Sequence, residues 1–134
     1  MHCTDHLADT SFLLQFPNPL RYKEFSTGRI YYNVLIDPWL SESQTDFNRL
    51  LSRQWHREKP AIGSIAEVVE LIKKGEEKNE EGHDQPWSKD GLNIIDAVFI
   101  LHEFTDHCHQ RTLVQLHPDV VICATPVCVY KLLL

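Results

Sequence analysis

The sequence predicts an α/β fold, in which helices flank a mixed sheet. Apolar runs of strand length occur along the chain, and in its second half they alternate with patterns of helical spacing, which favours a layered α/β architecture. With 134 residues, of which 43% are hydrophobic, the chain has the size and composition of one globular domain. The predicted strands span residues 11–16, 30–36, 94–101 and 120–124, and the predicted helices span residues 64–75, 109–116 and 127–134.

The first half of the chain predicts a β-hairpin. Residues 11–16 form a short apolar run that ends at Pro17, which cannot donate to a sheet ladder. Residues 30–36 are rich in Tyr, Val and Ile, which suit a pleated surface. Because residues 26–28 read Ser-Thr-Gly, we expect a turn between the two strands.

A helix is predicted to begin after Ser64. Ser64 and Glu67 have the spacing of a capping box, and apolar residues then recur three and four positions apart. Gly75 is a plausible stop for this helix. Residues 73–91 are mostly charged and polar, so they predict a surface loop, long for a compact domain.

The second half begins with residues 94–101, an almost continuous apolar run. Such a run predicts a strand that other elements cover on both faces. The strand predicted over residues 120–124 is closed by Thr125 and Pro126.

Charge and hydropathy exclude several classes of partner. The formal net charge of −6 argues against nucleic-acid binding and against docking on an anionic membrane surface. No apolar run is long enough to span a bilayer, and the polar N-terminus does not resemble a signal peptide. We therefore expect a cytoplasmic protein, whose four cysteines are reduced.

One short segment concentrates the chemistry of a metal site. His102, Asp106, His107 and His109 lie just past the apolar run of residues 94–101. Ligand-binding loops collect at the carboxyl ends of strands in α/β sheets, and imidazole and carboxylate are common zinc ligands. Two alternatives stay open: Asp106 or Thr105 caps a helix that begins near His107, or the histidines are ordinary residues of a surface loop.

The segment His102-Glu103-Phe104-Thr105-Asp106-His107 resembles the H-x-H-x-D-H signature of the metallo-β-lactamase superfamily, in the variant that continues Cys-His. The neighbouring strands resemble the same family in their order along the chain. The segments that carry this similarity are residues 7–14, 34–40, 95–101 and 120–126.

The resemblance implies roles for individual residues. His102 would ligate a first metal ion, and Asp106 and His107 would ligate a second. Phe104 stands where the family has its second His, so the first metal site departs from the family pattern. Asp37 matches an aspartate beside the family's active site, whose hydrogen bonds would orient the ligands. Equally, Asp37 could simply belong to a turn that ends its strand.

The resemblance also implies an activity and an architecture. The activity would be metal-dependent hydrolysis of a small molecule of the ester, lactone, amide or phosphoester type. One or two zinc ions are expected as cofactor, with iron or manganese as alternatives. Residues 1–134 would form a single domain that corresponds to the N-terminal half of the family's αββα sandwich.

An alternative function follows from the same comparison. Because the chain ends where the second half of such a sandwich would begin, it could be a truncated, catalytically inactive half-domain. In that case it would act as a weak metal-binding or interaction protein. Oligomers, or pairing with another chain through the uncovered sheet, are then expected.

Overall fold

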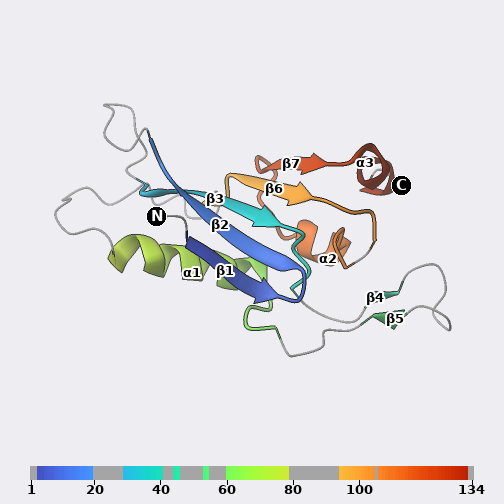
Figure 1. The fold of residues 1–134 in the computed structure, drawn as a ribbon, viewed down its shortest axis with the longest axis horizontal. Coiled ribbons are helices and arrows are strands. Elements are labelled where there is room, and N and C mark those ends of the chain that lie inside the picture. The colour runs from blue at the N-terminus through green and yellow to red at the C-terminus, as the bar shows by residue number, and fades with distance from the viewer. Residues whose placement is uncertain are drawn as a thin grey trace.

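The computed structural model describes residues 3–19, 29–40, 44–45, 53–54, 60–78, 94–104 and 106–132. Within these ranges the protein has an α/β fold built on a five-stranded mixed sheet (Figure 1), which confirms the predicted fold class. The strand order in the sheet is β1-β2-β3-β6-β7. These strands are β1 (Cys3–Ala8), β2 (Ser11–Pro17), β3 (Tyr31–Ile36), β6 (Ala97–Ile100) and β7 (Val121–Ala124). A separate two-stranded sheet, which the sequence did not predict, pairs β4 (Gln44–Thr45) with β5 (Arg53–Gln54).

The N-terminal strands are antiparallel. The predicted pairing of β2 with β3 is confirmed, with Phe12 opposite Ile36, and the turn predicted at residues 26–28 lies outside the described residues. The resemblance treated residues 7–14 as one strand, and that is wrong. A turn at Asp9 and Thr10 divides this segment between β1 and β2, which pair with each other.

Strands β6 and β7 run parallel to β3. Hydrogen bonds join β3 to β6 at both ends of the pair. At the beginning, the Asp96 N–H donates to the Asn33 carbonyl oxygen (2.9 Å), and the Asn33 N–H donates to Asp96 Oδ2 (2.7 Å). At the end, the Asp37 N–H donates to the Phe99 carbonyl oxygen (2.9 Å), and the Leu101 N–H donates to Asp37 Oδ1 (2.7 Å). The carboxyl ends of both strands therefore lie side by side.

Helix α1 (Ile65–Lys78) begins where its capping signal predicts. The Glu67 N–H donates to Ser64 Oγ (3.3 Å), as a capping box requires. Glu67 Oε2 accepts the N–H of Gly63 (3.0 Å) rather than that of the cap residue itself.

The end of α1 corrects the sequence prediction. The helix continues past Gly75 to Lys78, so the surface loop predicted over residues 73–91 is wrong for its first part. Residues 79–91 lie outside the described residues.

Tertiary contacts explain why Gly75 does not stop the helix. Ile72 belongs to the core, and Glu76 is also buried. The Glu76 carboxylate accepts the backbone N–H groups of Ile30 (2.7 Å) and Tyr31 (3.0 Å) at the start of β3. These bonds require one more helical turn after Ile72, and they outweigh the low helix propensity of glycine.

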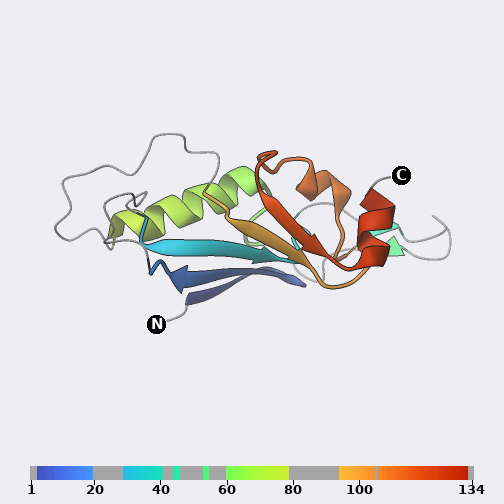
Figure 2. The same ribbon diagram turned by 90° about the horizontal axis from the view of Figure 1, so that it is seen from above.

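The hydrophobic core lies between the sheet and α1. Leu13, Leu35 and Val98 occupy matching positions on three neighbouring strands and are fully buried. They belong to one cluster with Val68 and Ile72 of α1. Figure 2 shows α1 and α2 (Gln110–Leu113) on the same side of the sheet.

The opposite side of the sheet, which we call the open face, is apolar and partly exposed, although Val34 and Ala97 at its centre are buried. Phe16, Tyr32, Phe99 and Val121 stand on it, at positions that alternate with the core residues. No helix of the described residues covers this side in Figure 2. The prediction that residues 94–101 are buried on both faces holds at Ala97 and Val98, which are both buried on opposite faces of β6. It is wrong at the end of the run, since Phe99 is 40% and Leu101 is 58% exposed.

The last elements are short. Helix α2 is confirmed within residues 109–116 but covers only Gln110–Leu113, and α3 spans Pro126–Leu132 after Thr125. Thr125 Oγ1 accepts the Cys128 N–H (3.4 Å) at the start of α3. Among the described residues, no helix is long and apolar enough to cross a bilayer.

Candidate metal centre

The predicted site residues lie at the carboxyl edge of the sheet. Asp37 follows β3, and residues 101–104 and 106–109 lie between β6 and α2 (Figure 1). We call these residues the metal loop, because they include the predicted ligands. Because β3 and β6 are parallel, the residues after them meet at one edge, which is where α/β proteins place ligand sites.

Asp37 is the most constrained residue of this edge. It is only 3% exposed, and its φ of 45° is uncommon for a residue other than glycine. The Ser11 hydroxyl donates to the Asp37 carbonyl oxygen (2.9 Å) and accepts the N–H of Trp39 (2.7 Å), which holds the backbone in this conformation. The side chain is thereby turned from the strand toward Leu101 and His107.

The Asp37 carboxylate orients His107. Asp37 Oδ2 lies 2.8 Å from His107 Nδ1, and a carboxylate can only accept, so Nδ1 carries the hydrogen. In a neutral imidazole this arrangement leaves the lone pair on Nε2, as in histidines that bind metals. Asp37 thus contacts His107. It also stands at the end of β3, where the turn reading of this residue places it.

His107 Nε2 faces a second carboxylate. It lies 3.7 Å from Asp106 Oδ2, too far for a hydrogen bond. Two ligand atoms about 2.1 Å from one tetrahedral zinc ion are about 3.4 Å apart, so this separation suits a shared ion. A cation bound between Nε2 and Oδ2 would interact favourably with both atoms.

The Asp106 carboxylate is largely buried. Within the described part of the chain, its Oδ1 is buried and makes no hydrogen bond. Asp106 does not cap α2, because the helix begins at Gln110 and has His109 at its N-cap, without a side-chain capping bond. The capping alternative is therefore not met by Asp106, and a buried carboxylate oxygen without a partner fits a metal ligand.

The Asp106 backbone is anchored by a residue that the sequence analysis missed. The Thr10 hydroxyl donates to the Asp106 carbonyl oxygen (2.7 Å), linking the β1–β2 turn to the metal loop. Ser11 holds Asp37 from the same turn. Nothing in the sequence pattern distinguishes these two hydroxyls from ordinary turn residues, because their partners are distant in sequence.

His102 lies near the pair but is turned differently. Its ring centroid is 5.6 Å from that of His107 and 4.4 Å from that of Phe104. His102 Nδ1 accepts the Phe104 N–H (3.3 Å) and lies 3.5 Å from Glu103 Oε2. A neutral ring that accepts at Nδ1 carries its hydrogen on Nε2, which does not suit ligation through that atom.

The predicted ligands are therefore only partly assembled. His107 and Asp106 fit a divalent cation, whereas His102 would have to give up its contact with the Phe104 backbone. Among the described residues, no group of three or more His, Cys, Asp or Glu side chains is close enough to hold a metal ion. His109, considered earlier among the possible ligands, is buried with its Nδ1 2.6 Å from Thr112 Oγ1.

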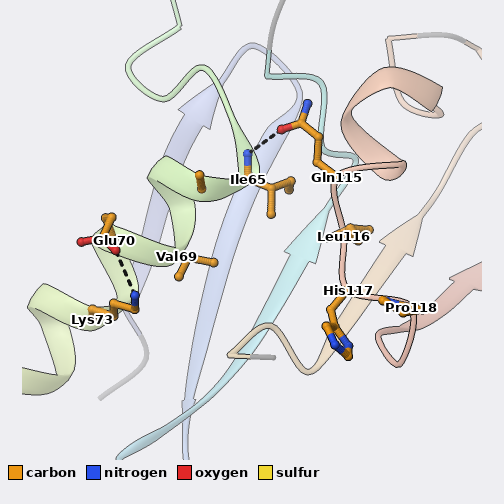
Figure 3. Close-up of a pocket in the computed structure, with 9 residues that line it drawn as sticks. Ile65, Val69, Glu70, Lys73, Gln115, Leu116, His117 and Pro118 are labelled. Atoms are coloured by element: carbon orange, nitrogen blue, oxygen red, sulfur yellow. Dashed lines mark hydrogen bonds and ion pairs between the residues drawn. The ribbon is translucent and has the colours of Figure 1, made fainter. Parts of the chain in front are cut away.

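A cavity of about 590 Å³ lies elsewhere, between α1 and residues 115–118. Figure 3 shows Val69 of α1 on one side and Leu116 on the other. The Ile65 N–H donates to Gln115 Oε1 (3.2 Å) at one end. No residue of the metal loop lines it, and its lining is mainly apolar. We therefore assign the candidate chemistry to the carboxyl edge of the sheet rather than to this cavity.

Comparisons with family models, with curated proteins and with solved structures find no match for this chain.

Proposed function

We propose that this protein is a metal-dependent hydrolase of the metallo-β-lactamase type that acts on a small molecule. The observation that carries the proposal is the 2.8 Å contact from Asp37 Oδ2 to His107 Nδ1. It leaves the His107 Nε2 lone pair available to a cation, 3.7 Å from Asp106 Oδ2. The buried, unbonded Asp106 Oδ1 supports it.

His107 and Asp106 would hold the cation, with His102 as the third ligand. The contact that turns His102 away is a long one, at 3.3 Å, so little is lost when the ring rotates. A mixed nitrogen and oxygen set suits zinc first, with iron or manganese as alternatives. When bound, such an ion polarises a scissile carbonyl or phosphoryl group and makes water a better nucleophile.

The protein's own residues have distinct roles in this proposal. Asp37 fixes the His107 tautomer and stabilises positive charge that reaches the ring. Thr10 holds the Asp106 backbone, so the Asp106 carboxylate is positioned before a metal ion binds. A cytoplasmic location belongs to the same proposal, and the free thiols of Cys123 and Cys128 are in keeping with a reducing compartment.

A second candidate is a non-enzymatic protein that binds another copy of itself through the open face. The exposed apolar side chains of Phe16, Tyr32, Phe99 and Val121 favour it, since such a patch marks interaction surfaces. This candidate predicts a stable oligomer and no metal-dependent hydrolysis.

The test of the hydrolase proposal is bound metal per chain, measured by elemental mass spectrometry after zinc loading and dialysis. We expect about one zinc ion per wild-type chain, and its loss in His107→Ala, because that variant lacks the oriented ligand. His117→Ala is the matched control, since His117 lies before β7, outside the metal loop, and is also part-buried beside an aspartate. A metal-free wild-type protein, or equal zinc in the His107 variant, would overturn the proposal.

A further inference from the structure

The cavity between α1 and residues 115–118 lies apart from the candidate metal centre. Its volume of about 590 Å³ falls within the range of small-molecule sites in proteins. Ile65 and Val69 of α1 line it from one side, and Leu116 lines it from the other (Figure 3). Ile65 and Val69 belong to the buried core, and Leu116 packs against that core. The cavity therefore offers an apolar surface that is continuous with the core.

Hydrogen bonds hold both walls of the cavity in place. The Ile65 N–H at the start of α1 donates to Gln115 Oε1 (3.2 Å), which joins one wall to the other. Within the second wall, the His117 carbonyl oxygen accepts the Val120 N–H (3.0 Å) and closes a turn. A preformed cavity requires little ordering of the protein when a ligand binds, which favours affinity.

The charges that line the cavity neutralise each other. Among the described residues of the lining, Glu70 and Lys73 are the ones with a full charge, and Lys73 Nζ donates to Glu70 Oε1 (3.0 Å). A charged ligand would meet both signs there and gain no net attraction. It would also lose hydration against the apolar walls, which costs free energy. The lining therefore favours a neutral ligand.

His117 adds a hydrogen-bond donor to the lining. Its Nδ1 accepts the Asp119 N–H (3.3 Å), so the hydrogen of the neutral ring is on Nε2. The Asp119 carboxylate, 3.6 Å from the same Nδ1, is too far away for a hydrogen bond. No residue that the structure describes accepts the Nε2 hydrogen of His117. A ligand oxygen would complete the hydrogen bonding of this ring.

We infer that this cavity binds a neutral, largely apolar small molecule with one hydrogen-bond-accepting oxygen, such as a medium-chain ketone. The apolar part lies against Ile65, Val69 and Leu116, and the oxygen accepts the hydrogen of His117 Nε2. This binding site goes beyond the proposed function and does not depend on it, because no residue of the metal loop lines the cavity. Binding involves no covalent step.

An NMR titration of the metal-free protein with 2-nonanone tests the site. The amide signals of Ala66, Val69 and Leu116 should shift with one common dissociation constant, on the order of 1 mM or below for a ligand of this size. Tyr32 and Val121 are exposed on the open face, and their signals should not shift. Shifts confined to the open face, or no saturable shift up to the solubility limit, would overturn the inference.

Two charged ligands test whether the site prefers a neutral molecule. Octanoate and nonylammonium have the same number of non-hydrogen atoms as 2-nonanone, and they carry opposite charges. Both should bind several-fold more weakly at neutral pH, since the Glu70–Lys73 pair attracts neither of them on balance. If either ion binds as tightly as the ketone, the assignment of a neutral ligand is wrong.

A substitution that fills the cavity tests its location. Ala66 is exposed on α1 and lines the cavity, so Ala66→Trp should weaken 2-nonanone binding by about tenfold or more while the fold is kept. Ala61→Trp is the matched control, because Ala61 is also exposed but lies before α1, outside the lining. Equal binding in wild type and Ala66→Trp would show that the ketone binds elsewhere.

His117→Phe tests the donor, since it keeps an apolar ring and removes Nε2. The dissociation constant of 2-nonanone should rise about threefold to tenfold, as the loss of one hydrogen bond implies. An unchanged constant would contradict the role of His117.

A second copy of the chain is the other occupant that such a cavity could hold. Light scattering on the wild type and on Ala66→Trp distinguishes the two. If the wild type forms an oligomer that Ala66→Trp abolishes, the cavity holds a second copy and the inference fails. Equal molar masses, with ketone binding lost in Ala66→Trp alone, support a small-molecule site.

Discussion

At the scale of single residues, Asp37 shapes the carboxyl edge of the sheet through both its backbone and its side chain. The left-handed backbone directs the chain away from β3, and the carboxylate joins the end of β6 to His107. An aspartate tolerates this conformation better than a branched residue, because its short side chain causes little steric conflict there. An uncommon backbone conformation and the orientation of the His107 ring are therefore combined at Asp37.

Asp37→Asn tests whether the Asp37 carboxylate sets the tautomer of His107, with almost no change in side-chain size. Asparagine also tolerates a positive φ, and its Oδ1 can still accept the Leu101 N–H. Its NH₂ group would donate to His107 Nδ1, which forces the ring hydrogen onto Nε2 and removes the ligating lone pair. We expect zinc affinity to fall by about 10–100-fold in a competition titration with a chelating dye.

Asp119→Asn serves as the control for this change, because Asp119 is an exposed aspartate near a different histidine, His117. Equal zinc affinity in wild type and Asp37→Asn would show that the tautomer of His107 does not govern binding.

Another residue-scale prediction concerns Glu76. Its carboxylate accepts two backbone N–H groups at the start of β3 while almost fully buried. Glu76→Gln replaces one accepting oxygen with an NH₂ group that faces an N–H, so a buried donor loses its partner. The free energy of unfolding should fall by about 1–3 kcal/mol in urea titrations.

The neighbouring exposed residue provides the comparison. Glu77→Gln should change the free energy of unfolding by less than about 0.5 kcal/mol, since Glu77 is exposed. Equal effects of the two substitutions would contradict the anchoring role of Glu76.

At the scale of elements, α1 shows how tertiary contacts override a local stop signal. Gly75 lies inside the helix, and a Cβ added there would meet no atom within 4 Å, apart from the helix's own backbone and chain neighbours. Gly75→Ala should therefore stabilise the protein by about 0.5–1 kcal/mol, through helix propensity and a more restricted unfolded chain. Urea unfolding checks this, and a destabilised variant would show that the helix needs glycine at this position.

Local signals in the sequence account for much of the fold. The apolar runs predicted β2, β3 and β7, and the Ser64–Glu67 box predicted the start of α1. Each of these signals acts over a few residues. The end of α1 depended on contacts with β3, more than forty residues away in sequence, and pattern analysis does not detect such contacts.

The candidate site was predictable in its residue types but not in its arrangement. The resemblance proposed Asp106 and His107 as ligands, and their proximity in the loop is largely local because they are adjacent in sequence. The anchors Thr10 and Ser11, and the rotation of His102 toward the Phe104 backbone, follow from packing between distant segments. Those features required the folded structure.

At the scale of the whole molecule, the two sides of the sheet differ in how they are covered. One side forms the core with α1, and the open face exposes aromatic and aliphatic side chains. If a second copy covers this face, each partner would contribute about 800 Å² to a standard interface.

Size-exclusion chromatography with light scattering tests that arrangement. Val121→Lys places a charge on the open face, so it should shift an oligomer toward the monomer. Val114→Lys is the control, because Val114 is exposed at the end of α2, away from the sheet. A wild-type monomer at high protein concentration would contradict pairing through the open face.

The β3–β6 pair is closed by an aspartate at each end, Asp96 at its beginning and Asp37 at its end. A slip of one residue would break the bonds of both and turn Phe99 into the core in place of Val98. The register of β3 and β6 is thus fixed by Asp96 and Asp37, which lie just outside the paired residues. In an evolving lineage, the apolar residues between these ends could be exchanged for one another while the geometry of the carboxyl edge is inherited unchanged.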